Sequence, residues 1–87
     1  MARIIVTVTS AEGWHARPIT AFAAVVADSG LEVTIGRIGA EQVRADSVLS
    51  LMTLGVRQNE QLEIVVSDSE ADAGTVDAFL TKARELF

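Results

Sequence analysis

The chain has 87 residues, of which 49% are hydrophobic, and it contains no cysteine. This length suits one domain with a core of modest size, and the apolar share is too high for a disordered chain. No apolar run approaches the roughly 20 residues that cross a bilayer, and no basic segment precedes an apolar one as in a secretory signal. The sequence therefore predicts a cytoplasmic protein without membrane insertion, with a single domain over residues 1–87.

The net charge of −5 is unevenly distributed along the chain. Residues 1–59 carry five arginines and five acidic residues and are neutral, whereas residues 60–87 carry seven acidic residues against one lysine and one arginine. A nucleic-acid-binding surface needs clustered lysines and arginines, which this sequence lacks. We therefore expect no nucleic acid among its partners.

Residues 3–9, RIIVTVT, alternate in the manner of a β-strand. Ile4, Val6 and Val8 stand at every second position, which predicts a strand with one buried and one largely wet face. The stretch GWHARP follows at 13–18 and contains the only histidine, tryptophan and proline of the chain.

A helix is expected directly after the histidine. Gly13 permits an unusual backbone turn, and Pro18 is tolerated only within the first turn of a helix, so the helix begins near Ala16. His15 then lies at the N-cap or just outside it. The apolar stripe of residues 16–28 consists of Ile19, Phe22, Ala23 and Val26.

The position of His15 has chemical consequences. The first backbone N–H groups of a helix, here those of Ala16 and Arg17, lack intrahelical acceptors and carry partial positive charge. Together with the Arg17 guanidinium they would hold an anion beside the imidazole. The same positive field disfavours imidazolium, so we expect His15 to be neutral and nucleophilic near pH 7 and able to accept a phosphoryl group.

On the residues alone, a second interpretation stays open, in which His15 only caps the helix and Arg17 is solvated. Other catalytic arrangements are excluded, because there is no second histidine, no cysteine, no G-x-S-x-G turn and no phosphate-binding glycine loop. We therefore expect no cofactor and no metal. Any phosphate that reaches His15 must be brought by a partner.

Residues 31–36, LEVTIG, alternate like the first strand, and Gly36 and Gly39 indicate a turn before a short strand near 42–44. Residues 46–56, DSVLSLMTLGV, then predict a short helix that Ser47 begins and Gly55 ends.

The short helix offers two apolar stripes. Leu51 and Leu54 suffice to bury one of them against a sheet. The second stripe consists of Val48, Leu49 and Met52. We expect this second stripe to reach the surface as a docking site, since compact exposed apolar patches mark such sites and methionine adapts to several partners. Alternatively, the helix is sandwiched and wholly buried.

The remaining elements are a strand over residues 61–66, QLEIVV, and a helix over residues 70–87. Four residues at the amino end of this helix are suited to capping it: Asp68, Ser69, Glu70 and Asp72. Four strands and three helices with short connections predict an α+β fold. We expect a two-layer open-faced sandwich, in which a four-stranded antiparallel sheet has the helices on one face.

Two stretches of this sequence resemble the histidine-containing phosphocarrier (HPr) family of the bacterial phosphoenolpyruvate:sugar phosphotransferase system. GWHARP is similar to the active-site motif of that family. ADSVLSLMTLGV, residues 45–56, is similar to its second signature, in which a serine opens the short helix and Leu-Gly ends it. The order of strands and helices matches over essentially the whole chain.

The resemblance implies that enzyme I, charged from phosphoenolpyruvate, phosphorylates His15 on Nδ1. His15 would pass the group to the IIA components of sugar permeases, while Arg17 neutralises the phosphate. The protein would be a monomer and a carrier, not an enzyme. Its partners would alternate on one surface, formed by Ala16, Arg17, Thr20, Val48, Leu49 and Met52.

Two positions, Trp14 and Asp46, depart from the family pattern. Trp14 stands where leucine or isoleucine is usual, and we assign it to the partner surface, with packing under the loop as the alternative. Ser47 matches a serine that an HPr kinase/phosphorylase modifies in some bacteria, but Asp46 would repel the added charge, which favours a simple N-cap. The alternatives to a phosphocarrier are a regulatory relative that acts through Ser47 and the same surface, and a non-catalytic interaction module.

Overall fold

The computed structural model describes residues 2–67 and 72–87. Within these residues the elements are β1 (Ala2–Thr7), α1 (Ala16–Ser29), β2 (Val33–Gly36), β3 (Val43–Arg44), α2 (Val48–Met52), β4 (Gln61–Val66) and α3 (Ala73–Arg84). The predicted order of strands and helices is confirmed. No helix among the described residues is long and apolar enough to cross a membrane.

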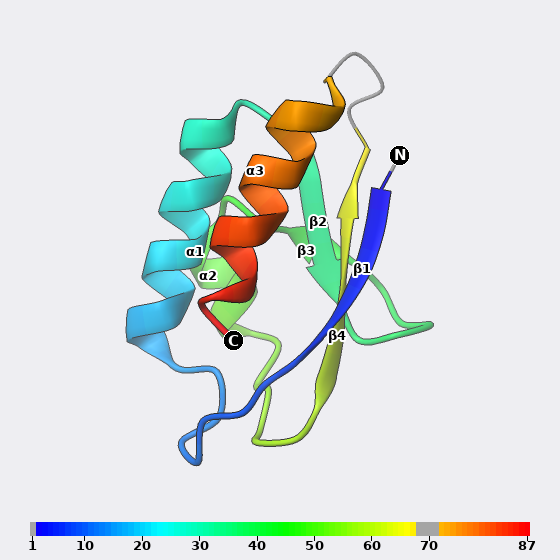
Figure 1. Ribbon diagram of the computed structural model, residues 1–87. Helices are drawn as coiled ribbons and strands as arrows, with labels where there is room; N and C mark the ends of the chain where they lie inside the picture. The colour runs from blue at the N-terminus through cyan, green and yellow to red at the C-terminus, as the bar shows by residue number, and fades with distance from the viewer. Residues whose placement is uncertain (1, 68–71) are drawn as a thin grey trace.

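The strands form one sheet in the order β1-β4-β2-β3, and each neighbouring pair is antiparallel. β4 is central and pairs with β1 along its whole length, from Ala2 opposite Val66 to Thr7 opposite Gln61. Figure 1 shows the three helices on one side of this sheet, with α1 and α3 next to each other, while the other face is open. The predicted α+β two-layer architecture is confirmed.

The core lies between the sheet and the helices. The four apolar residues predicted for the buried stripe of α1 are all buried, as are Phe79 and Ala83 of α3 and Leu51 of α2. β4 departs from strict alternation at one position. Val65 faces the side of the sheet that carries no helices, yet its side chain is buried. Val65 lies in the central strand between Arg3 and Thr34 of its neighbours, whereas Ile5, on the same face of an edge strand, is exposed.

Two of the helices, α2 and α3, differ from their expected boundaries by more than one residue, and α3 ends at Arg84 rather than at residue 87. α2 ends at Met52, with Thr53 as its C-cap, and Gly55 lies beyond the helix with a φ of +57°. α3 begins with Asp72 as its N-cap, whose Oδ1 accepts a hydrogen bond of 2.7 Å from the Thr75 N–H. The other three expected caps, Asp68, Ser69 and Glu70, lie outside the described residues.

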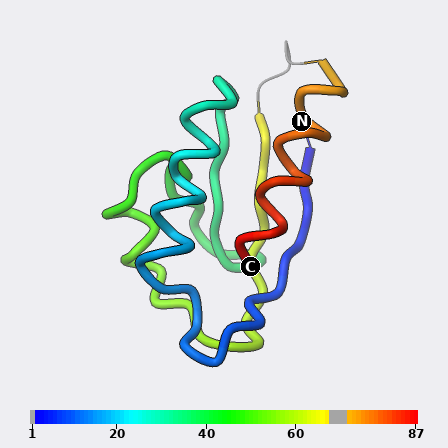
Figure 2. Tube along the Cα trace, turned by 60° about the vertical axis from the view of Figure 1, so that its left-hand side comes forward, coloured from blue at the N-terminus to red at the C-terminus, as the bar shows by residue number. Residues whose placement is uncertain are grey.

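Two loops lie side by side at one end of the sheet, below it in Figures 1 and 2. One joins β1 to α1 and contains His15, and the other joins α2 to β4. The Val8 N–H donates to the Glu60 carbonyl at 3.0 Å, and the Asn59 N–H donates to the Val8 carbonyl at 2.7 Å. The loop with His15 is therefore fixed against a segment more than forty residues later in the chain.

Candidate functional site

His15 is the N-cap of α1, as predicted. Its backbone is extended (φ −109°, ψ −176°), and its carbonyl accepts the first helical hydrogen bond from the Ile19 N–H at 3.1 Å. Its side chain makes no capping hydrogen bond to the described backbone. Because Pro18 carries no N–H, the amides that helix geometry leaves open at this end are those of Ala16 and Arg17.

The turn before His15 requires glycine. Gly13 has a φ of +76°, and a Cβ at this position would lie 2.5 Å from the Val56 carbonyl oxygen. The next residue, Trp14, donates its backbone N–H to that same oxygen at 3.0 Å. The backbone immediately before the histidine is thus packed on the loop that joins α2 to β4.

Trp14 is buried, which corrects its assignment to the partner surface. The residue is only 6% exposed, its indole stacks on Phe87 at a centroid distance of 4.8 Å, and it meets Phe22 edge-on at 5.4 Å. The indole Nε1–H donates to the Leu86 carbonyl at 3.2 Å. Trp14 therefore packs beneath the loop and anchors it, because the end of the chain covers the indole.

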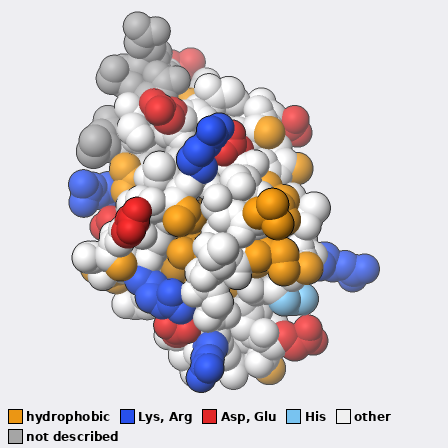
Figure 3. All heavy atoms as spheres, turned by 180° about the vertical axis from the view of Figure 1, so that it is seen from behind, with side chains coloured by type: hydrophobic (Ala, Val, Ile, Leu, Met, Phe, Trp, Pro, Cys, Tyr) orange, Lys and Arg blue, Asp and Glu red, His pale blue; other side chains and the backbone are white. Residues whose placement is uncertain are grey.

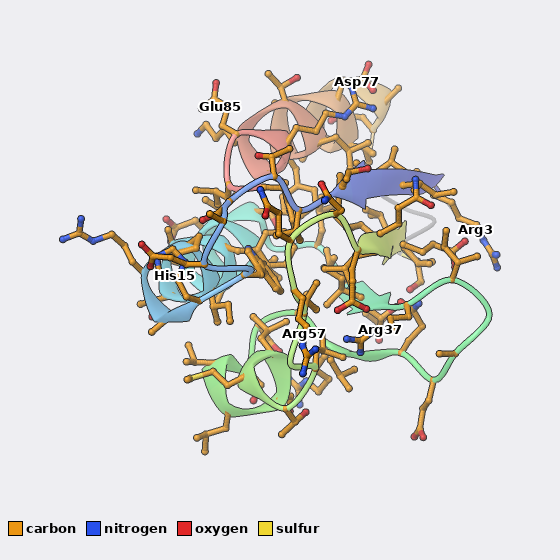
Figure 4. All side chains as sticks on the ribbon, turned by 90° about the horizontal axis from the view of Figure 1, so that it is seen from below. Arg3, His15, Arg37, Arg57, Asp77 and Glu85 are labelled. Atoms are coloured by element: carbon orange, nitrogen blue, oxygen red, sulfur yellow. The ribbon has the colours of Figure 1, made fainter. Side chains whose placement is uncertain are left out.

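The His15 side chain is 43% exposed. Figure 4 shows it at the edge of the molecule, beside the start of α1. Its Nδ1 lies 3.3 Å from the Gly13 carbonyl oxygen, and its Nε2 lies 3.6 Å from Oε2 of Glu12. Among the described charged side chains, Glu12 lies within 4 Å of the ring, whereas Arg17 is exposed at the first turn of α1.

Exposed apolar side chains lie on α2, as expected. Leu49 is 80% exposed and Met52 is 51% exposed, while Val48 is half-buried and Leu51 is fully buried. The alternative in which this helix is wholly buried is wrong. We call Val48, Leu49 and Met52 the α2 patch. In Figure 3 hydrophobic side chains gather next to the pale-blue histidine.

Thr20 is exposed on α1, one turn after Ala16. Its hydroxyl donates to the Ala16 carbonyl at 2.8 Å. The hydroxyl hydrogen is thus already used in a hydrogen bond within the helix. A partner can contact the methyl group of Thr20 and the lone pairs of its hydroxyl oxygen.

Ser47 caps α2, since its Oγ accepts a hydrogen bond of 3.3 Å from the Ser50 N–H. The predicted cap is confirmed. Asp46 makes a two-pronged ion pair with Arg44, at 3.1 Å from Nε and 2.8 Å from the terminal nitrogen, and the Arg44 hydrogen bonds lower the pKa of Asp46. The charge expected to repel a phosphate on Ser47 is thus already paired, and modification of Ser47 stays a prediction.

The sequence analysis missed an ion pair beside the site. Arg37 donates to the Glu60 carboxylate at 2.9 and 3.2 Å, to the Leu54 carbonyl at 2.7 Å and to the Gly55 carbonyl at 3.3 Å. The side-chain hydrogen bonds from Arg37, with a backbone bond from Arg57, lower the pKa of Glu60 to about 2. Arg37 and Arg57 lie close together in Figure 4.

This ion pair holds the segment that precedes Val56, on which the His15 loop rests. Arg37 and Glu60 are 23 residues apart, and no local pattern pairs them. The contact of Glu12 with His15 was also missed, although an acidic residue three positions before a histidine was a readable signal.

The family model described as the PTS HPr component phosphorylation site matches residues 2–82. The phosphocarrier protein HPr of Streptomyces coelicolor is 37% identical over 70 residues, which cover 80% of this chain and 74% of that protein. The chain belongs to the HPr family of the phosphotransferase system, as the two sequence motifs predict, and it functions as a phosphocarrier.

Solved structures agree on the fold. An HPr structure from Thermoanaerobacter tengcongensis superposes with a TM-score of 0.80 at 20% identity, covering 100% of this chain and 96% of that one. HPr from Bacillus anthracis gives a TM-score of 0.78 at 20% identity, covering 98% and 94%. A mycoplasma histidine-containing phosphocarrier protein gives 0.75 at 19% identity, covering 95% and 96%.

Proposed function

We propose that His15 carries the phosphoryl group, that enzyme I of the phosphotransferase system supplies it, and that sugar-specific IIA components receive it. The observation that carries this proposal is the exposed imidazole of His15. It lies at the start of α1 but makes no capping hydrogen bond to that helix. His15 is the only histidine in the chain. The open amides of Ala16 and Arg17 and the Arg17 guanidinium are suited to the three anionic oxygens of the group.

The transfer needs little beyond position and charge. The Nδ1 lone pair forms a bond to phosphorus while the bond between phosphorus and the donor breaks, and the donor leaves with that electron pair. The ring keeps its proton on Nε2 and becomes cationic. In the return step a nucleophile of the acceptor bonds to phosphorus and the electron pair of the N–P bond goes back to Nδ1. The chain is thus a carrier, modified and restored in each cycle.

The ring must turn for this step, since Nδ1 faces the Gly13 carbonyl in the described structure. The exposure of the side chain leaves room for that rotation. Donor and acceptor would dock in turn on the α2 patch and the exposed side chains of Ala16, Arg17 and Thr20. Because α1 carries no lysine, we expect this docking to be apolar and only weakly dependent on salt.

The location and the oligomeric state of the carrier are also part of the proposal. We propose that it works in the cytoplasm, as a monomer, since one copy presents both His15 and the α2 patch. Nucleic acid has no place in this scheme, because the chain is acidic and its arginines are dispersed.

The test mixes the protein with phosphoenolpyruvate, magnesium and enzyme I of the same host, and follows the intact mass before and after mild acid. We expect one acid-labile phosphoryl group, none in His15→Ala, and a normal amount in Ser47→Ala. Phosphate on His15→Ala would place the acceptor elsewhere, and acid-stable phosphate would point to a hydroxyl. Near-UV circular dichroism, which reports the packing of Trp14, shows that each variant is folded. Adding a IIA component should then remove the label.

A further inference from the structure

Both ring nitrogens of His15 face oxygen atoms. Nδ1 lies 3.3 Å from the Gly13 carbonyl oxygen, and Nε2 lies 3.6 Å from a carboxylate oxygen of Glu12. A neutral imidazole has one ring proton, so it can donate to only one of these two oxygens. The tautomer of His15 therefore depends on which oxygen attracts the proton more strongly.

The two oxygens differ in charge. The Glu12 carboxylate carries a full negative charge and at 3.6 Å attracts a proton on Nε2 through space, whereas the nearer Gly13 carbonyl is a neutral dipole within hydrogen-bond distance of Nδ1. The Glu12 side chain is 75% exposed, so water weakens the attraction but does not abolish it. The turn that carries Glu12 is held by hydrogen bonds to Ser10, from the Gly13 N–H to its carbonyl at 2.9 Å and from the Glu12 N–H to its hydroxyl at 3.3 Å.

We propose that Glu12 is a positioning residue for phosphoryl transfer, which keeps the ring proton on Nε2 and so leaves the Nδ1 lone pair free to attack phosphorus. The inference rests on the proposed role of His15. Without Glu12, the Gly13 carbonyl is the nearer acceptor and draws the proton to Nδ1, where it blocks the nucleophile.

Glu12 acts in the same direction by its charge. A phosphoryl group is anionic, and a carboxylate beside Nε2 opposes its approach to that nitrogen. Attack through Nδ1, after the ring has turned from the Gly13 carbonyl, keeps the phosphoryl group close to the start of α1, because Nδ1 neighbours the ring carbon that is bonded to Cβ.

The first measurement is the tautomer itself, from the ¹⁵N resonances of the His15 ring at about pH 8.5, well above the ordinary histidine pKa of about 6.5. We expect Nε2–H to predominate in the parent protein. Glu12→Ala should lower the ratio of Nε2–H to Nδ1–H by up to about fivefold, since an exposed carboxylate attracts a neutral ring no more strongly than it attracts a cation. Glu12→Gln, which keeps an oxygen acceptor without the charge, should fall between them.

The matched control is Glu41→Ala, which removes another exposed acidic side chain, between β2 and β3, and changes the net charge equally. It should leave the tautomer ratio unchanged. High salt should narrow the difference between Glu12→Ala and the parent protein, because exposed charges are screened. A merely structural role for Glu12 would give neither the graded effect of Glu12→Gln nor the salt dependence.

The second measurement is the rate of phosphoryl uptake from enzyme I. We expect Glu12→Ala to lower kcat by about twofold with little change in KM, less than the change in the tautomer ratio, because the rate follows the fraction of rings that carry Nε2–H. An unchanged ratio, or an unchanged kcat despite a changed ratio, would overturn the inference. If the parent protein accepts no phosphate on His15, the proposed function fails and takes the kinetic part of this inference with it, while the ratio still decides whether Glu12 controls the ring proton.

Discussion

α1 and α3 lie next to each other on the same face of the sheet, yet they begin in different ways (Figure 1). At the start of α3, the Asp72 carboxylate accepts a hydrogen bond from the Thr75 N–H and so closes the helix end with its own side chain. At the start of α1, His15 occupies the same position without such a bond. The residue of α1 that matches Thr75 is Pro18, which has no N–H, and the amides of Ala16 and Arg17 are left open for an anion from outside.

The two helix starts are also stabilised differently. α3 relies on a local contact within four residues, whereas α1 is held by the packing of the loop before it, with Gly13 and Trp14 seated on Val56 and Leu86. Distant packing therefore replaces the cap at α1 and leaves the N-cap side chain free for chemistry. The difference shows that a helix end without a cap, in a protein that caps its neighbour, is a place to look for a bound anion.

The largest expected effect comes from giving α1 a capping side chain, as α3 has. His15→Ser installs a side chain that can cap α1 through the Arg17 N–H, since Pro18 has none, so we expect complete loss of acid-labile phosphate together with a gain of about 0.5 kcal/mol in stability. Intact mass and urea denaturation measure the two changes. A loss of stability would contradict the view that this helix end is uncapped.

The next largest effect is expected from disrupting the packing of Trp14, which holds the start of α1 in place of a capping side chain. Trp14→Ala removes a buried indole from contact with Phe22 and Phe87, so we expect a loss of about 3–5 kcal/mol in the free energy of unfolding. Trp14→Phe keeps an aromatic ring but loses the hydrogen bond to the Leu86 carbonyl. We expect this variant to lose less stability than Trp14→Ala, about 1 kcal/mol for the lost hydrogen bond. Chemical denaturation ranks the three proteins, and a cost for Trp14→Ala no larger than that of a surface substitution would show that the indole does not anchor the loop.

The smallest expected effect is the pH dependence of the stability that the Asp72 cap gives to α3. The hydrogen bond from the Thr75 N–H lowers the pKa of Asp72 in the folded protein below the value of about 3.9 that an unfolded chain has. The cap therefore stabilises α3 fully above that unfolded value, and this stability is lost as the pH falls through the lowered folded pKa.

Asp72→Ala should thus unfold at a lower urea concentration than the parent protein at pH 7, and the gap should narrow below about pH 4. Asp72→Asn, which caps without titrating, is the matched control and should keep its midpoint difference from Asp72→Ala in acid. A gap that is constant with pH would mean that the charge of Asp72 does not contribute to the cap.

Local patterns in the sequence were sufficient for much of this structure. The stripe of α1 is buried at all four predicted positions, and the start of the helix follows from Pro18 and Gly13, because their backbone constraints act on adjacent residues. The exposure of Leu49 and Met52 follows from the limited area that two turns of helix can bury.

The rest depends on residues far apart in the chain. The burial of Trp14 requires Phe87, and the ion pair of Arg37 requires Glu60, so neither is visible in a local window. The end of α2 was placed too late because Gly55 has the backbone of a helix terminus but lies three residues after Met52, the last residue of the helix.

The seating of Trp14 on the Leu86 carbonyl has a consequence for synthesis on the ribosome. His15 emerges well before the atoms that hold its loop, at Val56 and Leu86, have been added. β1 likewise has no partner strand until β4 has been translated. A nascent chain therefore displays the histidine without its fixed surroundings, and the carrier becomes competent only after the last of these residues has left the exit tunnel.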